Sequence, residues 1–177
     1  DYTENGFELP SFSPNSVNFV IANHVLEHSP NPLAALLRWY EVVKPGGVLY
    51  MALPIYDKCF DRGRQLTSVE HIFDDYKFYK ENNKEEIFKR NRHHYEEWLD
   101  ISSVAILGET YTIPQGDERE KLIQKNLETS EEIHFHTFNL ESVRELLLKI
   151  KQELLPGLEI KHIYDVSGEV LFIIGKK

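Results

Sequence analysis

Histidine is the residue type in this sequence that is best suited to acid-base chemistry, because its pKa lies near neutrality. The chain has eight His residues, and five of them are candidates for substrate binding or proton removal. Those five candidate catalytic residues are His28, His71, His94, His134 and His136. Their sequence context leaves three interpretations open, namely pocket residues, metal ligands, or hydrogen-bonded residues of the core.

The metal interpretation rests on a pair of histidines near the end of the chain. His134 and His136 are two residues apart on a segment that we expect to be extended, so both side chains would point to one side. They could then chelate a metal together with His94 or His71. No Cys pair and no His-Glu-x-x-His pattern accompanies them in the sequence, and we assign no metal site. In the structural interpretation, His94 lies on an apolar helical stripe as a hydrogen-bonded core residue.

Glu27 and His28 directly follow the first predicted strand and are further polar candidates. A negative charge is favourable near the amino end of a helix, so Glu27 could simply cap the next helix. His28 is the better candidate for a pocket residue. Four aromatic residues could line a sugar-sized pocket or could belong to the core: Tyr56, Phe60, Tyr95 and Trp98.

The elements that must position these residues begin with a strand, a helix and a second strand. Residues 17–22 are continuously apolar, which predicts a strand buried on both faces. Asn31 and Pro32 begin a helix as cap and first residue, and Pro45-Gly46 ends it in a tight turn. Residues 48–53 form the next buried strand. A strand-helix-strand crossover implies a parallel pair, and the predicted fold class is therefore α/β.

Residues 55–133 interrupt this pattern with amphipathic segments, and we expect a largely helical insertion. Asn139 then caps a helix that Pro156-Gly157 ends. Residues 160–166 and 170–174 follow as two strands joined by a tight turn, which predicts an antiparallel hairpin.

The composition is that of a single acidic globular domain covering residues 1–177. The net charge of −9 disfavours a nucleic-acid partner, which usually requires a basic face. No apolar run approaches the ~20 residues that span a bilayer, and we expect no membrane partner. Cys59 is the one cysteine and cannot form a disulfide within the chain, which favours a reducing, cytoplasmic setting.

Two short motifs carry a resemblance to a known family. Asn23-His24-Val25-Leu26-Glu27-His28 follows the first strand, and Lys44-Pro45-Gly46-Gly47 precedes the second. Together with the terminal hairpin they resemble class I S-adenosylmethionine-dependent methyltransferases of the type 11 kind. In that family the sheet order is 3-2-1-4-5-7-6. The resemblance implies a partial Rossmann-like sheet of strands 4-5-7-6, whose last strand is antiparallel.

The resemblance also implies S-adenosylmethionine as cofactor and a set of residues to bind it. Asn5 and Gly6 correspond to the loop after strand 3, which meets the adenine. Asn5 stands where an Asp is common, which weakens the expected contact with the adenine amino group. The family places the residues that end strand 4 by the methionine part of the cofactor, largely through backbone atoms: Ala22, Asn23 and His24.

Three stretches within and after the insertion are similar to one subgroup of these methyltransferases. They are residues 64–71, 94–98 and 133–136. Members of this subgroup are associated with polysaccharide biosynthesis and glycosyltransferase pathways. The resemblance therefore implies a transferase that methylates a small molecule or a saccharide.

The resemblance covers the carboxyl-terminal portion of the family's domain. Only eighteen residues precede Phe19, so the Gly-rich turn that contacts the cofactor cannot lie upstream of it in this sequence. We expect a truncated domain, inactive alone. The alternative is a non-catalytic methyltransferase-like remnant or interaction module. In both cases strand 17–22 would form an exposed edge, and we expect it to pair by self-association, giving an oligomer, or with the missing amino-terminal half.

Overall fold

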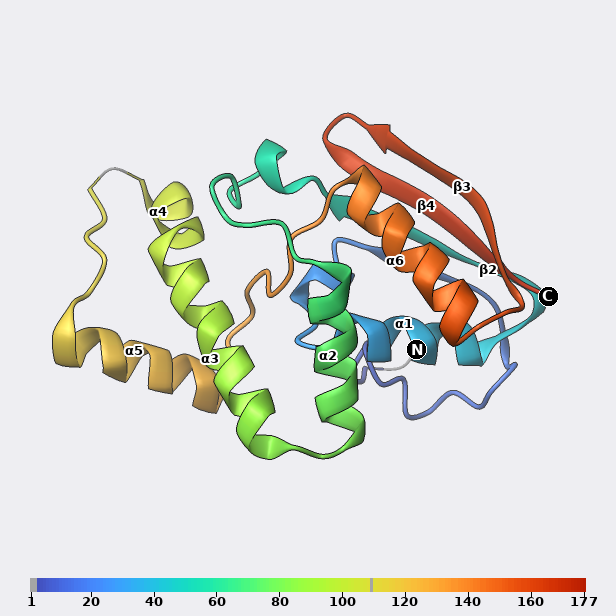
Figure 1. Cartoon of the computed structure of the whole chain (residues 1–177), viewed down its shortest axis with the longest axis horizontal. Helices are drawn as coiled ribbons and strands as arrows, with labels where there is room; N and C mark the ends of the chain where they lie inside the picture. The colour runs from blue at the N-terminus through green and yellow to red at the C-terminus, as the bar shows by residue number, and fades with distance from the viewer. Residues whose placement is uncertain (1–2, 109) are drawn as a thin grey trace.

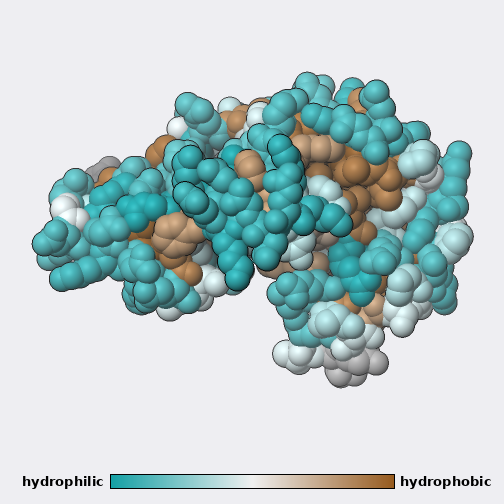
Figure 2. Space-filling view, turned by 60° about the horizontal axis from the view of Figure 1, so that its bottom comes forward, coloured by the Kyte–Doolittle hydropathy of each residue, from teal (hydrophilic) through white to brown (hydrophobic). Residues whose placement is uncertain are grey.

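The computed structural model describes residues 3–108 and 110–177. One half of the molecule is a four-stranded sheet with α1 and α6 packed against it. α2 packs against these two helices, and α3, α4 and α5 extend to the other side (Figure 1). Figure 2 shows more hydrophobic surface over the half with the sheet than over the half with α3 and α5.

The sheet has the order β1-β2-β4-β3. β1 (Val17–Asn23) pairs in parallel with β2 (Val43–Pro54), and β4 (Glu169–Lys176) is antiparallel to both β2 and β3 (Leu158–Val166). The expected α/β class is thus confirmed as a mixed four-stranded sheet whose last strand is antiparallel. The parallel pair and the terminal hairpin were both predicted.

β2 is longer than predicted because it includes the Pro-Gly segment that we expected to be a tight turn. α1 (Pro32–Val42) ends directly before it. Val17 of β1 pairs with Val43 of β2, but Phe19 pairs with Val48. The residues of β2 between these two pairs therefore form a bulge. Gly46 has a φ of +82° within this bulge, which explains why a glycine is needed there.

The prediction that residues 17–22 are buried on both faces is wrong. Val20 and Ala22 face the core, but Phe19 is 60% exposed and Ile21 is 61% exposed. β1 is the end strand of the sheet, and within the described chain little covers the face to which these two side chains point. Although residues 17–22 are mostly apolar, only one face of β1 is buried in the described chain.

The main core lies between the sheet and the helices α1 and α6. Asn31 caps α1 by accepting a hydrogen bond from the Ala34 amide at 3.0 Å. α6 (Leu140–Glu153) begins with a reciprocal pair of hydrogen bonds between Asn139 and Ser142. The buried indole of Trp39 donates to the Gly6 carbonyl at 2.7 Å, which fastens the amino-terminal loop onto α1.

Helices occupy most of the chain between β2 and α6. They are α2 (Val69–Lys80), α3 (Lys84–Asp100), α4 (Ser102–Leu107) and α5 (Gly116–Thr129), and the short 3-10 turn η2 (Tyr56–Lys58) precedes them. Another 3-10 turn, η1 (Leu26–His28), lies between β1 and α1. An isolated parallel bridge joins Ile55 to Phe138, so this helical region leaves and rejoins the sheet at one place. None of the described helices is both long and apolar enough to cross a membrane.

The bulge in β2 generates a prediction about Gly47. A Cβ added there would lie 2.6 Å from Val43 Cγ1 and closer still to the Asn18 carbonyl oxygen. We expect Gly47→Ala to lower the free energy of unfolding by about 1–3 kcal/mol, because the backbone must shift to relieve the overlap. Gly6→Ala is the matched control, since a Cβ there meets nothing within 4 Å. Urea denaturation of both variants checks this, and equal stabilities would contradict it.

Candidate functional site

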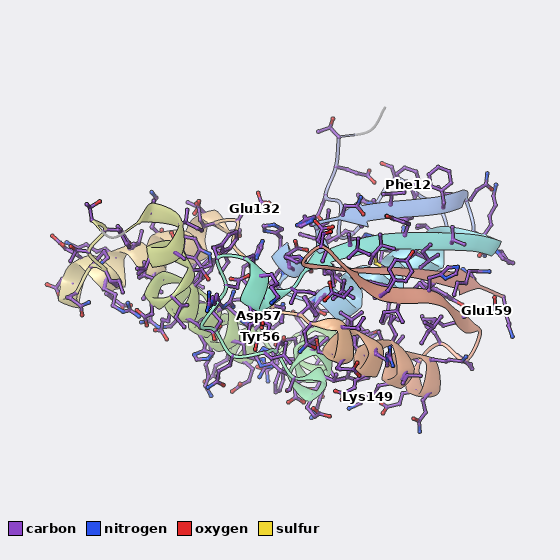
Figure 3. All side chains as sticks on the ribbon, turned by 90° about the horizontal axis from the view of Figure 1, so that it is seen from above. Phe12, Tyr56, Asp57, Glu132, Lys149 and Glu159 are labelled. Atoms are coloured by element: carbon purple, nitrogen blue, oxygen red, sulfur yellow. The ribbon has the colours of Figure 1, made fainter. Side chains whose placement is uncertain are left out.

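Three segments meet beyond the carboxyl ends of β1 and β2. The turn η1 follows β1, the loop 59–64 follows η2, and residues 133–136 lie against η1. The amides of Phe135 and His136 donate to the Glu27 carbonyl at 2.8 and 3.3 Å, which fixes this arrangement. Figure 3 shows Tyr56, Asp57 and Glu132, which flank the junction, between the sheet and the outer helices.

Asp61 and His134 form a buried pair at this junction. His134 Nδ1 lies 2.6 Å from Asp61 Oδ2, and Asp61 Oδ1 accepts from Arg64 at 2.9 Å and Ser102 at 2.7 Å. Burial alone would raise the pKa of the Asp61 carboxyl. The His134 hydrogen bond, the Arg64 charge and the Ser102 hydroxyl outweigh it and hold this pKa below its usual range. Asp61 is therefore ionised, and it orients His134 with Nδ1–H as donor and Nε2 free to accept a proton.

Glu27 is fully buried, and neither carboxylate oxygen has a hydrogen-bond partner among the described residues. Its Oε1 lies 3.9 Å from His134 Nε2 and 3.6 Å from His24 Nδ1. Burial raises the pKa of this carboxyl. Glu27 does not cap the next helix, as we considered possible, because Asn31 caps α1. A buried carboxylate without a donor calls for a functional explanation.

Two rings contact the His134 ring. The His28 ring meets it edge-on with centroids 4.6 Å apart, and the Phe60 ring lies 4.5 Å away. Burial lowers the pKa of His28, and its Nδ1 lies 3.0 Å from the Ile133 carbonyl oxygen. Burial raises the pKa of Cys59 to about 11, so this thiol stays protonated near neutrality and is a poor nucleophile.

A second cluster brings the other three candidate histidines together. His71 Nε2 lies 3.2 Å from His94 Nε2 and 3.2 Å from Asp75 Oδ2, and His136 Nε2 lies 3.1 Å from the same oxygen. The expectation that His134 and His136 point to one side is wrong. A bend at His136 sends its side chain to Asp75, whereas His134 turns to Asp61.

The candidate cofactor residues fall into two groups. Ala22, Asn23 and His24 end β1 beside Glu27, and His24 has a φ of +52° that is unusual for a residue with a side chain. His24 Nε2 also lies 2.7 Å from Glu169 Oε1. Asn5 and Gly6 lie instead on the amino-terminal loop against α1, where Gly6 accepts from Trp39.

A cavity of about 870 Å³ lies between the amino-terminal loop, α1, α2 and α3. Asn5 lines it, together with Asn31, Asp75 and Arg90. Among the described residues of its wall, Asn5 is the one cofactor candidate. This cavity therefore connects the amino-terminal loop with the Asp75 cluster and not with the end of β1.

Sequence reasoning missed several residues of the site. Asp61 and Ser102 carry no recognisable pattern, and Arg64 and Glu97 were visible only as members of longer stretches similar to the methyltransferase subgroup. Of the four aromatic candidates, Tyr95 belongs to a small buried cluster with Ile133 and Phe135, against which Trp98 packs. Phe60 lies in ring contact with a candidate histidine, His134.

A family model described as a methyltransferase domain matches residues 2–51. No curated protein matches the chain. Two of the solved structures that are similar to it are described below. This chain spans 60% of the length of each of them.

The first structure is a SAM-dependent methyltransferase, possibly a histamine N-methyltransferase, from Thermotoga maritima, with 15% identity over 96% of this chain and a TM-score of 0.42. The second is a putative Zn-dependent alcohol dehydrogenase from Rhodobacter sphaeroides, with 11% identity over 93% of this chain and a TM-score of 0.44. TM-scores below 0.5 support no functional conclusion. The match to residues 2–51 covers β1, η1, α1 and most of β2, so this part of the chain is similar to a methyltransferase domain.

Proposed function

We propose that this chain is part of a class I methyltransferase that acts on a small molecule or a saccharide. In this proposal β1, β2, β3 and β4 correspond to strands 4, 5, 6 and 7 of that family. Residues 55–133 are an insertion within one domain. The observation that carries the proposal is the buried, unpartnered carboxylate of Glu27 beside the Asp61–His134 pair, within and next to the matched segment.

The donor-poor environment of Glu27 fits S-adenosylmethionine. Both oxygens of Glu27 lack a hydrogen-bond partner in the described chain, and the cofactor carries two cationic groups, an ammonium and a sulfonium. Ala22, Asn23 and His24 would hold its methionine end, and Asn5 and Gly6 would meet its adenine. When bound, the cofactor supplies an electrophilic methyl group.

The residues of the chain would act on the methyl acceptor. His134 accepts a proton at Nε2 from an acceptor hydroxyl or amine, because Asp61 holds its other nitrogen as a donor. Asp61 also stabilises the imidazolium that results. His28 and Phe60 contact the His134 ring and would restrain it. The saccharide as acceptor rests on the similarity of residues 64–71, 94–98 and 133–136 to the polysaccharide-associated subgroup.

The alternative is a methyltransferase-like module that neither binds the cofactor nor catalyses. The two functions differ in whether Glu27 contributes to ligand binding. They can be separated without knowledge of the methyl acceptor.

Calorimetric titration with S-adenosylmethionine tests the proposal. We expect micromolar binding by the full-length product of the gene and weaker binding by residues 1–177 alone. Glu27→Gln should weaken binding by about tenfold or more, because the neutral side chain no longer attracts a cationic group. Glu145→Gln, an exposed change on α6, is the matched control. Failure of the full-length protein to bind would favour the non-catalytic module.

Glu27 should also make stability depend on pH. Its pKa is raised above 4.5 in the folded chain, so the folded state binds more protons than the unfolded state, and stability falls as pH rises past that value. Glu27→Gln removes the buried charge, and near pH 8 we expect it to stabilise the fold by about 1–3 kcal/mol. Near pH 5 the gain should be smaller. Urea denaturation at both pH values measures this, and a gain that does not change with pH would be inconsistent with it.

We further propose that the free edge of β1 pairs with β1 of a second copy. β1 is an end strand with two large exposed apolar side chains, and such edges tend to recruit another strand. Light scattering should show a dimer that dissociates on dilution. Ile21→Lys should shift it to monomer, whereas Leu148→Lys on α6, also exposed, should not. A wild-type monomer at all concentrations would rule out self-association.

A further inference from the structure

We propose that His71, Asp75, His94 and His136 bind one divalent transition-metal ion, with Zn²⁺ as the ion that this donor set fits best. The sequence left metal binding by His134 and His136 with His94 or His71 open, and we assigned no site because no Cys pair or His-Glu-x-x-His pattern is present. The folded chain supplies a different arrangement. Its four donors come from α2, α3 and the segment between α5 and α6.

The distances between the donor atoms match a tetrahedral site. One nitrogen from each histidine and one carboxylate oxygen all lie within 4.8 Å of one another. The three contacts among them of 3.1–3.2 Å are close to the edge of a zinc tetrahedron, which is about 3.4 Å for Zn–N bonds of about 2.1 Å. An ion at the centre would need only small shifts of these side chains.

The hydrogen-bond partner of His136 on its other nitrogen fits a metal ligand. His136 Nδ1 lies 3.1 Å from the Ser29 carbonyl oxygen, which can only accept, so Nδ1 carries a proton. His136 Nε2 is the nitrogen that faces Asp75 Oδ2, and in the neutral ring this nitrogen offers a lone pair to an ion.

The surroundings of the cluster have the features of a metal site. Asp75 Oδ1 accepts from Arg90 Nε, which orients the carboxylate so that Oδ2 faces the histidines. Ser29 orients His136 in the same way. Such outer hydrogen bonds fix the tautomer and the direction of metal ligands. His94, His136 and Asp75 are buried, whereas the His71 side chain is 27% exposed and offers the ion a path of entry.

Four protein ligands indicate a structural centre, because a catalytic zinc keeps one position open for water or substrate. Here the ion would join α2 and α3 to residues 133–136, which also carry His134. Metal binding would therefore fix the segment that presents His134 to Asp61. The proposal rests on the geometry of this cluster alone and does not depend on methyltransferase activity.

Metal analysis of the tag-free chain, purified without chelator, tests the proposal. We expect inductively coupled plasma mass spectrometry to find about one zinc ion per chain. After removal of the metal with a chelator, Co²⁺ should bind with the visible absorption of a tetrahedral site. Substoichiometric metal together with no cobalt spectrum would overturn the proposal. This part uses the unchanged chain, so it does not depend on whether a variant folds.

Two neighbouring positions provide the matched variants. His71→Ala removes the most exposed of the four ligands, so the fold should survive, and zinc affinity should fall on the order of 100-fold. His93→Ala removes the exposed histidine next to His94 and should bind as the wild type does. Zinc should raise the melting temperature of the wild type and His93→Ala but not of His71→Ala. Equal binding by both variants would place the ion elsewhere and refute the site.

Discussion

The buried guanidinium of Arg64 holds together the parts of the chain that form the candidate site. It donates to Asp61 at 2.9 Å and to Glu97 of α3 at 2.8 Å, and also to the carbonyls of His134 and Phe135 at 2.7 and 3.0 Å. A buried cation must be paired and fully hydrogen-bonded, because its desolvation costs several kcal/mol. These contacts meet that requirement only if the loop 59–64, α3 and residues 133–136 stay in place. The position of His134 is therefore a consequence of satisfying Arg64.

Much of the fold could be predicted because it follows from local periodicity. The apolar runs, the Asn31 and Asn139 caps and the hairpin turn each indicate one element within a few residues, and their sequence implies the parallel pair. The errors concern features that depend on neighbours. Whether Phe19 and Ile21 are buried depends on what lies beyond the sheet face, and a run of apolar residues does not contain that information.

The site was predictable only in its residue types. Histidines were recognised as candidates, but their grouping depends on partners far away in the sequence. Asp61 and His134 are 73 residues apart, and His136 and Asp75 are 61 apart. Alternation along an extended segment suggested a common direction for His134 and His136. The bend at His136 breaks that alternation, and it is fixed by contacts of its backbone with Glu27 and of its ring with Ser29.

Residues 133–136 contribute to two clusters. In the first, Asp75 Oδ1 is paired with Arg90 and Asp75 Oδ2 faces His71 and His136. In the second, neither carboxylate oxygen of Glu27 has a hydrogen-bond partner among the described residues. The two carboxylates differ in what surrounds them. Asp75 is surrounded by three imidazoles that can complete the coordination of an ion, which leaves no position for another ligand.

Glu27 instead borders His24, whose side chain is 46% exposed, and His28, whose side chain is 22% exposed. In the proposed function a ligand would approach Glu27 past these two partly exposed side chains. A closed set of four donors stabilises a permanent ion, whereas a single buried carboxylate next to an opening is suited to a ligand that binds and leaves. The same segment thus separates a position for structural metal binding from a position for reversible ligand binding, and the rigidity of the first would preserve the geometry of the second.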